Sequence, residues 1–562
     1  MPESLAHRRE LRFWGWGYVD EELAPAEETR LTELVALTTG GSAAVTAPRL
    51  EEFSLPAPRG RPPVALASIC SATPYDRLTH AYGKSFADGV RMLQRAVPRP
   101  PDWVAFPRDE AQLEGLLAWA DSAAAAVIPF GGGTSVCGGV ETAVQGDYGL
   151  VLSIDLQYLN RVLELDRSSR AALIEGGALG PELEAALKPH QLTLRHFPQS
   201  FQFSTLGGWI ATRAGGHYAT QYTHIDDFVE SIRMLTPSGL LESRRLPGSG
   251  AGPSPDRMLL GSEGTLGLIT RAWMRVQDRP RFRASASVRF ADMTSACSAV
   301  RAISQAALFP SNCRLLDPVE ALINGVGDGT SAVLVLAFES ADHPLDAWLT
   351  RALELMADHG GEWDREAAQR SLRSAGAEEG EHRQGEAGAW RNQFLRAPYY
   401  RNYLTPRGVI ADTFETAITW DRFEALYQGV QEAVGRAIRE ATGAEGMLSC
   451  RFTHVYPDGP APYFTFYARG TGSGDMAAML GRWRQIKLAA NEAVTALGGT
   501  VTHHHAVGRD HRPQGYDRQV PPLFQAAFAG ARAVLDPRGM MNPGVLVDTP
   551  GRGAVGGGVL GA

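Results

Sequence analysis

One stretch of the sequence, His196 to Ile269, decides the fold. It begins HFPQSFQFSTLGGWIATRAGGHYATQYTHIDDFVESIRMLTPSGLLE and, after a short spacer, ends MLLGSEGTLGLI. Two glycine-rich turns and a Ser-Glu-Gly-Thr-Leu-Gly turn are joined by hydrophobic strands. Glycine lets a backbone N–H approach a ligand where any Cβ would clash, and successive N–H groups in one concavity bind phosphate. The stretch therefore predicts loops that hold a phosphate-bearing ligand.

A third glycine-rich element lies upstream, PFGGGTS at residues 129–135, directly after a predicted buried strand at 126–129. A P-loop would end in Gly-Lys-Ser/Thr, but Gly133 is followed by Thr-Ser with no lysine. The dinucleotide fingerprint Gly-x-Gly-x-x-Gly is not met either, because Val136 stands at its last position. We therefore expect a diphosphate site that is not built on a Rossmann fold.

Composition bounds the class of protein. The chain has 562 residues, too many for one hydrophobic core, so two or three domains are expected. Its formal net charge of −8 argues against a nucleic-acid partner, which would need a basic surface. A local basic pocket for an anionic substrate remains compatible with this charge.

The five cysteines are scattered and show no Cys-x-x-Cys spacing, so neither a disulfide framework nor a metal site is expected. The N-terminus lacks the apolar core of a secretory signal, and no run approaches the roughly 18 apolar residues of a membrane span. We expect a cytoplasmic protein, with peripheral membrane association left open.

The pattern of predicted helices and strands divides the chain into four parts. Residues 1–96 form a helical N-terminal region, and residues 97–277 alternate strands and helices around the three glycine-rich elements. Residues 278–475 carry β-α-β-α units of ferredoxin-like type. Residues 476–562 form a C-terminal segment.

The three glycine-rich elements, in this order, resemble the flavin-binding half of the vanillyl-alcohol-oxidase type FAD oxidoreductases. Within that type, nearly the whole chain resembles the alkyldihydroxyacetonephosphate synthase (alkylglycerone-phosphate synthase) family, on PFGGGTSV, FSTLGGWIATRA, GSEGTLGLIT and HHHAVG. The resemblance implies an α+β fold, with an FAD-binding domain of vanillyl-alcohol-oxidase (PCMH) type at 97–277, a ferredoxin-like cap domain and a helical N-terminal region. It also implies that FAD is bound non-covalently.

The activity that this resemblance implies belongs to ether lipid biosynthesis. The enzyme would exchange the acyl chain of acyl-dihydroxyacetone phosphate for a long-chain fatty alcohol, with the flavin as an electron sink. An FAD-linked 2-hydroxyacid dehydrogenase of the D-lactate or glycolate type is the alternative, because it shares the first three motifs. A flavin-bound protein without turnover is a third hypothesis. The resemblance further implies a homodimer.

The resemblance implies that the cap binds substrate and that the C-terminal segment completes the active site and the FAD domain, and it places the catalytic residues other than His196 on these two parts. Arg401, in the stretch YYRNY, would hold the substrate phosphate, since guanidinium is a planar, permanently charged fork. Tyr463 would act as acid and base, which requires a nearby cation because its ordinary pKa is near 10. Histidine transfers protons near neutrality. The remaining expected catalytic residues are His196, Arg314, His503, His504 and His505.

The residues expected to contact FAD come from the glycine-rich elements and the turns beside them. They are Pro129, Phe130, Gly131, Gly132, Gly133, Thr134, Ser135, Gln199, Ser200, Phe201, Gln202, Phe203, Ser204, Thr205, Thr212, Arg213, Ala214, Gly215, Glu263, Gly264, Thr265, Leu266, Gly267, Leu268 and Ile269.

Each of these residues also has a structural interpretation. A histidine triplet suggests metal ligands, but three adjacent residues on a strand cannot all face one ion. Arg314 or Arg401, taken alone, would be read as half of a structural ion pair. Tyr463 alternates with Thr465 along a predicted strand, which is equally typical of core packing. The catalytic interpretation therefore depends on finding these side chains together.

Overall fold

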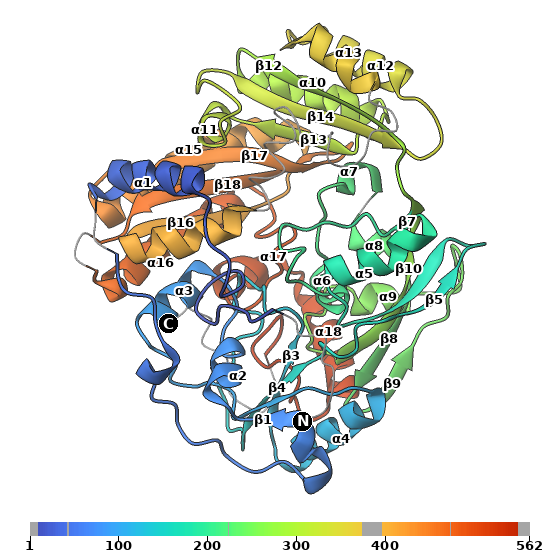
Figure 1. Ribbon diagram of the computed structural model, residues 1–562, viewed down its shortest axis with the longest axis vertical. Helices are drawn as coiled ribbons and strands as arrows, with labels where there is room; N and C mark the ends of the chain where they lie inside the picture. Colours follow the sequence, from blue (N-terminus) through green and yellow to red (C-terminus); the bar gives the residue numbers. More distant parts are fainter. Residues whose placement is uncertain (1–8, 42–43, 223, 374–395, 472–473, 549–562) are drawn as a thin grey trace.

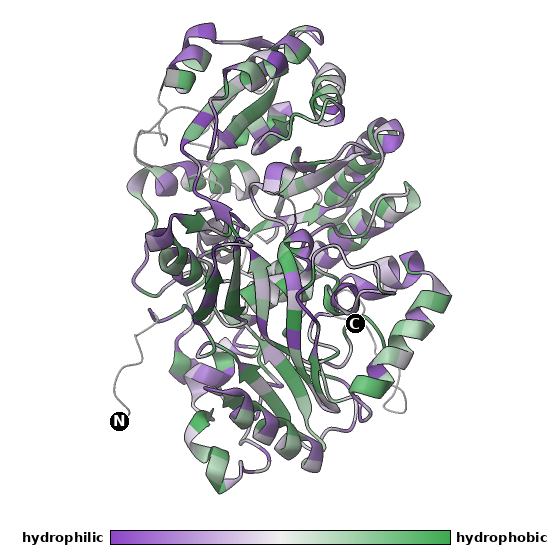
Figure 2. Ribbon diagram, turned by 90° about the vertical axis from the view of Figure 1, so that its right-hand side faces the viewer, coloured by the Kyte–Doolittle hydropathy of each residue, from purple (hydrophilic) through white to green (hydrophobic). Residues whose placement is uncertain are grey.

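The computed structural model describes residues 9–41, 44–222, 224–373, 396–471 and 474–548. Figure 1 shows two smaller sheets below and one larger sheet with its helices above. Hydrophobic residues run along the strands of these sheets, and hydrophilic residues gather on helix faces and loops at the periphery (Figure 2). Mixed helices and sheets confirm the predicted α+β class.

The first small sheet delivers the chain into the glycine-rich element at residues 131–133. Its strands lie in the order β1-β2-β4-β3, with β2 and β3 both parallel to β4. Helix α4 covers it with the leucines that the predicted helical periodicity placed inward, and Asp109 caps its N-terminus. The bounds are β1 Cys70–Ser71, β2 Trp103–Ala105, β4 Val151–Asp155, β3 Ala126–Phe130 and α4 Glu110–Ser122.

The second small sheet is antiparallel, in the order β5-β6-β10-β8-β9, and a strand pair, β11 with β7, lies beside it. Helices α5 and α6 pack on its buried face through Leu183, Trp209 and Ile210. The bounds are β5 Val162–Asp166, β6 Ala171–Glu175, β10 Leu268–Arg275, β8 Val229–Thr236, β9 Gly239–Glu242, β11 Gln277–Asp278, β7 Leu192–Thr193, α5 Gly180–Leu187, α6 Leu206–Thr212, α7 Ala219–Tyr222, α8 Ile225–Phe228 and α9 Pro255–Leu259.

The cap is one seven-stranded antiparallel sheet, ordered β15-β12-β14-β13-β17-β18-β16. Two β-α-β-β-α units form it, and they join where β13 pairs with β17. The first unit is β12 Phe282–Phe290, α10 Met293–Gln305, β13 Asn312–Leu316, β14 Ala332–Ser340 and α12 Asp346–Ala357. The second is β16 Val409–Glu415, α15 Trp420–Thr442, β17 Met447–Val455, β18 Pro460–Arg469 and α16 Met476–Ala496. Short β15 Glu362–Trp363, α11 Pro318–Ile323 and α13 Arg365–Arg373 complete the cap.

Both terminal regions extend across the two bodies. The N-terminal helix α1, Pro25–Thr39, contacts β16 and β18 of the cap, whereas β1 belongs to the first small sheet. Helix α16, which the sequence placed at the start of the C-terminal segment, packs along α15 of the cap. After α18, Pro522–Leu535, the chain returns to the first sheet, where Met541 forms a bridge with Val127. Two further helices, α2 Pro74–Thr79 and α3 Phe86–Leu93, lie in the N-terminal region.

No helix within the described ranges combines the length and apolar character that a bilayer span requires.

A buried ion pair joins the lower body to the cap. Arg195, just after β7, donates from Nε to Glu339 Oε2 at 3.0 Å, and its second nitrogen donates to the other carboxylate oxygen. Both side chains are nearly inaccessible, and the guanidinium carbon lies 3.9 Å above the Tyr218 ring. Arg283 also approaches this carboxylate at 3.4 Å. Removing the carboxylate would therefore leave buried positive charge without its counterion.

We expect Glu339→Ala to destabilise the protein by about 3–5 kcal/mol, the usual cost of an uncompensated buried charge. Thermal unfolding checks this against Glu354→Ala, which removes the exposed partner of Arg351 and should change stability by about 0–1 kcal/mol. Equal melting temperatures for the two variants would contradict a stabilising role for the junction.

Candidate active site

A single large pocket of ≈ 670 Å³ lies between the lower body and the cap. Its floor is made by the glycine-rich elements, and its roof by β16, β17 and β18. Helices α1 and α11 close one end, through Leu31, Leu34, Leu322 and Ile323. A volume of this size is typical of a pocket for a cofactor or small molecule.

The glycines of the first element form a cradle in which a side chain would not fit. A Cβ on Gly131 would lie 2.3 Å from Thr205 Oγ1, and one on Gly132 would lie 1.6 Å from the carbonyl oxygen of Phe203. Gly133 has a positive φ of 64°. Among the described residues, no acceptor is found for the backbone N–H groups of Gly132, Gly133 and Thr134. Donors facing a concavity without protein acceptors suit a diphosphate, so the cradle fits FAD.

Most of the residues expected to contact FAD line this pocket. Phe203 instead packs against Trp16 and Tyr399, and Gln202 accepts a hydrogen bond from Tyr399. Arg213 points outward to Asp226. Phe201, Thr265 and Leu266 also lie behind the wall. The lining residues are Pro129, Phe130, Gly131, Gly132, Gly133, Thr134, Ser135, Gln199, Ser200, Ser204, Thr205, Thr212, Ala214, Gly215, Glu263, Gly264, Gly267, Leu268 and Ile269.

Glu263 ties the C-terminal segment to the floor of the pocket. Its two carboxylate oxygens accept hydrogen bonds of 2.8 Å from the backbone N–H groups of Val507 and Gly508. The Asn542 amide donates to the carbonyl oxygens of Glu263 and Gly139. Burial raises the pKa of Glu263 to about 7 despite these bonds. This network explains how the histidine triplet, just before Val507, is held over the pocket.

On the roof, three functional side chains stand in one row across the sheet. Strand pairing places Tyr463 directly between Glu415 on β16 and Arg451 on β17. The Tyr463 hydroxyl donates to Thr413 Oγ1 at 3.0 Å, and the Arg451 guanidinium lies 4.0 Å from the centre of the tyrosine ring. Burial raises the pKa of Tyr463, while Arg451 opposes the rise. The phenol is therefore protonated at neutral pH and can donate a hydrogen bond.

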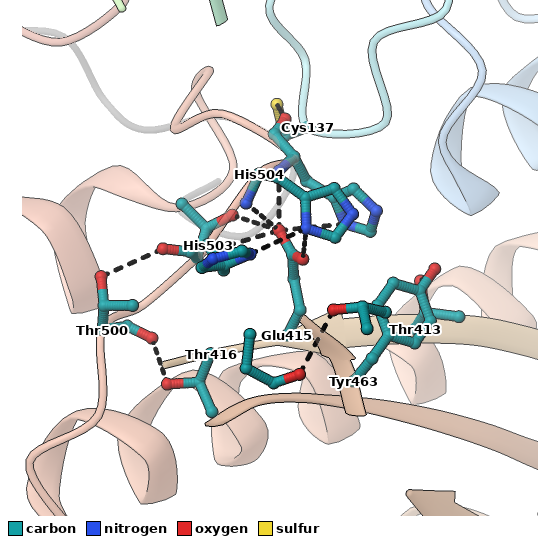
Figure 3. Close-up of polar contacts among 12 residues, drawn as sticks. Cys137, Thr413, Glu415, Thr416, Tyr463, Thr500, His503 and His504 are labelled. Carbon is teal, nitrogen blue, oxygen red and sulfur yellow. Dashed lines mark hydrogen bonds and ion pairs between the residues drawn. The ribbon is translucent and has the colours of Figure 1, made fainter. Parts of the chain in front are cut away.

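Glu415 organises the histidine triplet. Its Oε1 accepts hydrogen bonds from the backbone N–H groups of His503, His504 and His505 at 3.1, 2.6 and 2.6 Å, and from the Thr502 hydroxyl at 3.0 Å. Its Oε2 lies 2.5 Å from His504 Nδ1. Figure 3 shows the carboxylate pointing from its strand into the histidine loop. Although burial disfavours its charge, the neighbouring histidines hold the pKa of Glu415 well below its usual range.

The three histidines differ in position. His504 and His505 line the pocket, whereas His503 lies behind them, with its Nδ1 at 3.0 Å from His504 Nδ1. Burial lowers the pKa of His505 to about 4, and it lowers the pKa of His503 well below its usual value. The triplet forms bends and not a strand, so consecutive side chains can point the same way. Because Nδ1 of His504 lies against the Glu415 carboxylate, its other ring nitrogen, Nε2, is available to a ligand in the pocket.

Arg401 lines the pocket close to a second buried carboxylate. Its guanidinium donates to Asp412 Oδ1 at 2.6 Å and to the Lys84 carbonyl oxygen at 3.3 Å. Trp483 and Lys487 of α16 bind the other oxygen of Asp412. Burial opposes its ionisation, but Lys487 and Arg401 lower the pKa of Asp412. Two cations thus share one carboxylate beside the pocket, which leaves net positive charge for an anion.

Arg314 and His196 are buried near the pocket but do not line it. Arg314, on β13, donates to His217 Nδ1 at 3.1 Å, and burial together with nearby Arg451 lowers its pKa to about 9. His196 packs against Trp209, with ring centres 4.9 Å apart. Neither ring nitrogen of His196 has a hydrogen-bond partner among the described residues, and burial lowers its pKa to about 3.

Sequence reasoning did not single out Glu415, Arg451 or Asp412. Period-2 alternation along residues 409–415 would have put Thr413 and Glu415 on one strand face, but that strand was not predicted. Arg451 meets Tyr463 only through strand register, and Asp412 meets its cations only through the docking of α16. No local sequence pattern predicts these contacts.

The arrangement brings four chemical functions into one pocket. The cradle can hold a diphosphate, and His504 offers a base whose other nitrogen lies against a carboxylate. Tyr463 offers a proton donor, and Arg401 offers a cation for an anionic substrate group. Two groups of side chains, His454 with His503 and His504 and Glu415 with His504 and His505, are also spaced closely enough that they could hold a metal ion.

Two protein-family models match separate parts of the chain. Residues 101–243 match the FAD binding domain family, and residues 279–546 match the C-terminal domain of FAD linked oxidases. Both matches fall on the regions assigned above to the pocket floor and to the cap with its C-terminal extension.

Curated relatives extend the similarity over most of the chain. The alkyldihydroxyacetonephosphate synthase of Dictyostelium discoideum is 28% identical over 499 residues, which cover 84% of this chain and 77% of the relative. That of Trypanosoma brucei brucei is 28% identical, covering 85% and 78%. Glycolate oxidase subunit GlcD of Bacillus subtilis (strain 168) is 26% identical, covering 79% and 89%.

Solved structures share the fold. An alkyldihydroxyacetonephosphate synthase superposes with a TM-score of 0.77 at 23% identity, covering 95% of this chain and 98% of that chain. p-Cresol methylhydroxylase superposes with a TM-score of 0.64 at 12% identity, covering 94% and 98%. The predicted PCMH-type fold is confirmed. The chain therefore carries the FAD binding domain and the C-terminal domain of FAD linked oxidases, with FAD as its cofactor, and over most of its length it is similar to the alkyldihydroxyacetonephosphate synthases.

Proposed function

We propose that the protein is an alkylglycerone-phosphate synthase, which exchanges the acyl chain of acyl-dihydroxyacetone phosphate for a long-chain fatty alcohol. One observation carries the proposal: the Glu415–His504 pair and Tyr463 face the same pocket as the glycine cradle, and that pocket continues into an apolar end. Relatives named as synthases support it. A 2-hydroxyacid dehydrogenase would have no use for the apolar end.

FAD would lie with its diphosphate in the cradle at residues 131–135 and its remaining parts along residues 199–215 and 263–269. When bound, it supplies an electron sink for the substrate carbon that carries the ester. We further propose that its binding is non-covalent. The described lining residues include no cysteine, and the loop of His504 and His505 is held at Glu415 by hydrogen bonds.

His504 would serve as the base that takes a proton at Nε2. A carboxylate beside Nδ1 fixes the tautomer and stabilises the protonated ring, as in other carboxylate–histidine pairs. Tyr463, protonated because burial raises its pKa, would donate its proton or hydrogen bond to a substrate oxygen. Glu415 and Arg451 would keep this tyrosine in place from the two neighbouring strands.

The substrate phosphate would bind at Arg401. This guanidinium lines the pocket and shares Asp412 with Lys487, so an incoming phosphate meets two positive charges and one negative charge. Arg314, buried beside Arg451, adds positive potential from behind the roof. His196 would act through Trp209, against which it packs and which itself lines the pocket.

The aliphatic chains would occupy the end of the pocket between α1 and α11. The apolar residues Leu31, Leu34, Leu322, Ile323 and Met447 line this end, together with the polar Arg30, Glu33, Glu320 and Asn324. Burying a methylene group is worth about 0.8 kcal/mol, so such a lining favours a long-chain alcohol over a short one.

Two side chains at this end of the pocket line it and are also exposed to solvent. Leu37 is 81% exposed and Leu322 is 56% exposed. We propose that they contact a membrane surface peripherally, where the fatty alcohol is dissolved.

We also propose that the protein is a homodimer. Exposed apolar side chains on α18, among them Leu523 and Phe524, support this proposal.

The activity test supplies purified, FAD-loaded protein with palmitoyl-dihydroxyacetone phosphate and labelled hexadecanol. We expect labelled alkyl product, released palmitate and no requirement for an electron acceptor, because the exchange is redox-neutral. Dye reduction with D-lactate or glycolate, without alkyl product, would instead establish the dehydrogenase.

Tyr463→Phe should lower kcat by roughly 10²–10⁴-fold, the usual contribution of a general acid, because it deletes only the hydroxyl. FAD content and melting temperature should stay near those of the wild type, since the ring still packs beneath Arg451. Tyr427→Phe is the matched control, because its hydroxyl binds Asp317 outside the pocket. An active Tyr463→Phe enzyme would remove the tyrosine from the mechanism.

Replacing Leu37 and Leu322 together by glutamate should reduce co-sedimentation with phosphatidylcholine vesicles on the order of tenfold or more, given about 1.5–3 kcal/mol per buried leucine. Turnover of a short-chain, water-soluble alcohol should persist. Leu240→Glu, at an exposed site on β9, is the control. Unchanged vesicle binding of the double variant would place any membrane contact elsewhere.

A further inference from the structure

A line of hydrogen-bonded side chains leads away from His504 and has no part in the roles above. His503 Nδ1 lies 3.0 Å from His504 Nδ1, and at the opposite side of its ring Nε2 lies 2.8 Å from the Tyr456 hydroxyl. The same hydroxyl is hydrogen-bonded to Nε2 of His224. Three contacts thus connect four titratable groups in a row.

The line runs from His504 in the pocket to His224, in the segment that precedes α8. His504 lines the pocket, whereas His503, Tyr456 and His224 do not. His224 precedes α8 on the lower body and is partly exposed, and Tyr456 follows β17 of the cap. The side chains come from three separate segments, so their alignment is a product of the tertiary fold.

The donors and acceptors are compatible with proton transfer along the line. A neutral imidazole carries one N–H and one acceptor nitrogen, and a phenol can donate one hydrogen bond while accepting another. The proton on His504 Nδ1 is shared between Glu415 Oε2, at 2.5 Å, and His503 Nδ1, at 3.0 Å, and His503 Nε2–H donates to the Tyr456 oxygen. The Tyr456 O–H then donates to His224 Nε2, and His224 carries its own proton at Nδ1.

The proposed reaction requires such an exit. The bond from C1 of dihydroxyacetone phosphate to the acyl oxygen breaks, and a bond from C1 to the alcohol oxygen forms. The alcohol loses its O–H proton, and the fatty acid leaves as a carboxylate at neutral pH. One proton per turnover must therefore pass from an apolar pocket to solvent, while the electron count of the organic reactants is unchanged.

We propose that His503, Tyr456 and His224 form a relay that carries this proton from His504 to solvent, an inference that rests on the proposed synthase function. The proton taken up at His504 Nε2 releases the one on Nδ1 to His503, whose Nε2 proton passes to Tyr456. The phenol proton then passes to His224, which releases its Nδ1 proton to water.

The groups around the relay suit transient charge. Burial lowers the pKa of His503 well below its usual value and that of His224 to about 4, so neither ring retains the proton. Asp226 faces His224 and favours its protonated form at the exit, although Arg213 opposes it. Glu415 similarly faces His503 at the pocket end. Both ends of the relay thus have a carboxylate nearby.

His454 packs against the relay but does not belong to it. Its ring centre lies 5.0 Å from that of His503 and 5.2 Å from that of His224. Its Nε2 must carry the hydrogen, because it contacts the carbonyl oxygen of Gly216 at 3.0 Å. Burial keeps the pKa of His454 well below the usual value, so its ring packs beside the relay as an uncharged group.

The test is Tyr456→Phe in the FAD-loaded enzyme, which removes both relay hydrogen bonds and keeps the ring. We expect kcat to fall about 10²-fold, the low end for proton-transfer groups, with KM for both substrates and FAD content unchanged. His224→Ala should also lose turnover and should recover it with added imidazole, which can accept the proton at the vacated site. Wild-type enzyme should show no stimulation by imidazole.

A structural role would not give this pattern. Tyr427→Phe, which removes a hydroxyl bonded to Asp317, should keep wild-type kcat at every imidazole concentration. Wild-type kcat in both Tyr456→Phe and His224→Ala would overturn the relay and leave direct release from His503. Loss of activity in His224→Ala that imidazole does not restore would overturn it as well. A wild-type enzyme that forms no alkyl product would instead refute the proposed function.

Discussion

The buried carboxylate of Glu415 is the interaction on which the roof of the pocket depends. One oxygen accepts the backbone N–H groups of three consecutive histidines, and the other lies against His504 Nδ1. An irregular loop lacks the regular backbone hydrogen bonds of a helix or a sheet, and buried N–H groups must nevertheless find acceptors. The carboxylate therefore both shapes the loop and supplies the charge that orients the base.

This constraint connects parts of the chain that are far apart in sequence. Glu415 ends β16 of the cap, whereas the histidines precede Val507, whose backbone is held by Glu263 from the pocket floor. The loop is thus held by two carboxylates, that of Glu415 on the cap and that of Glu263 on the pocket floor. Because both anchors are buried, the histidine side chains are held in place before any ligand arrives, which is what the proposed proton transfer requires.

The same architecture separates the two tasks of the pocket. The lower body provides backbone donors and glycine surfaces, which suit a cofactor common to many FAD-linked oxidases. The cap and α1 provide the charged row, the arginine beside Asp412 and the apolar end, which would bind the proposed substrate. Similarity to both synthases and glycolate oxidase is consistent with this division.

The sequence alone determined the cofactor loops, because glycine spacing reports directly on where backbone must approach a ligand. It also determined the α+β class, and the motifs pointed to Tyr463, Arg401 and the histidine triplet. Only the tertiary structure decided which of these face the pocket. Strand register placed Arg451 and Glu415 on either side of Tyr463, and the docking of three segments aligned His503, Tyr456 and His224. Contacts of this kind depend on packing between segments that are far apart in sequence, so the periodicity of the sequence does not predict them.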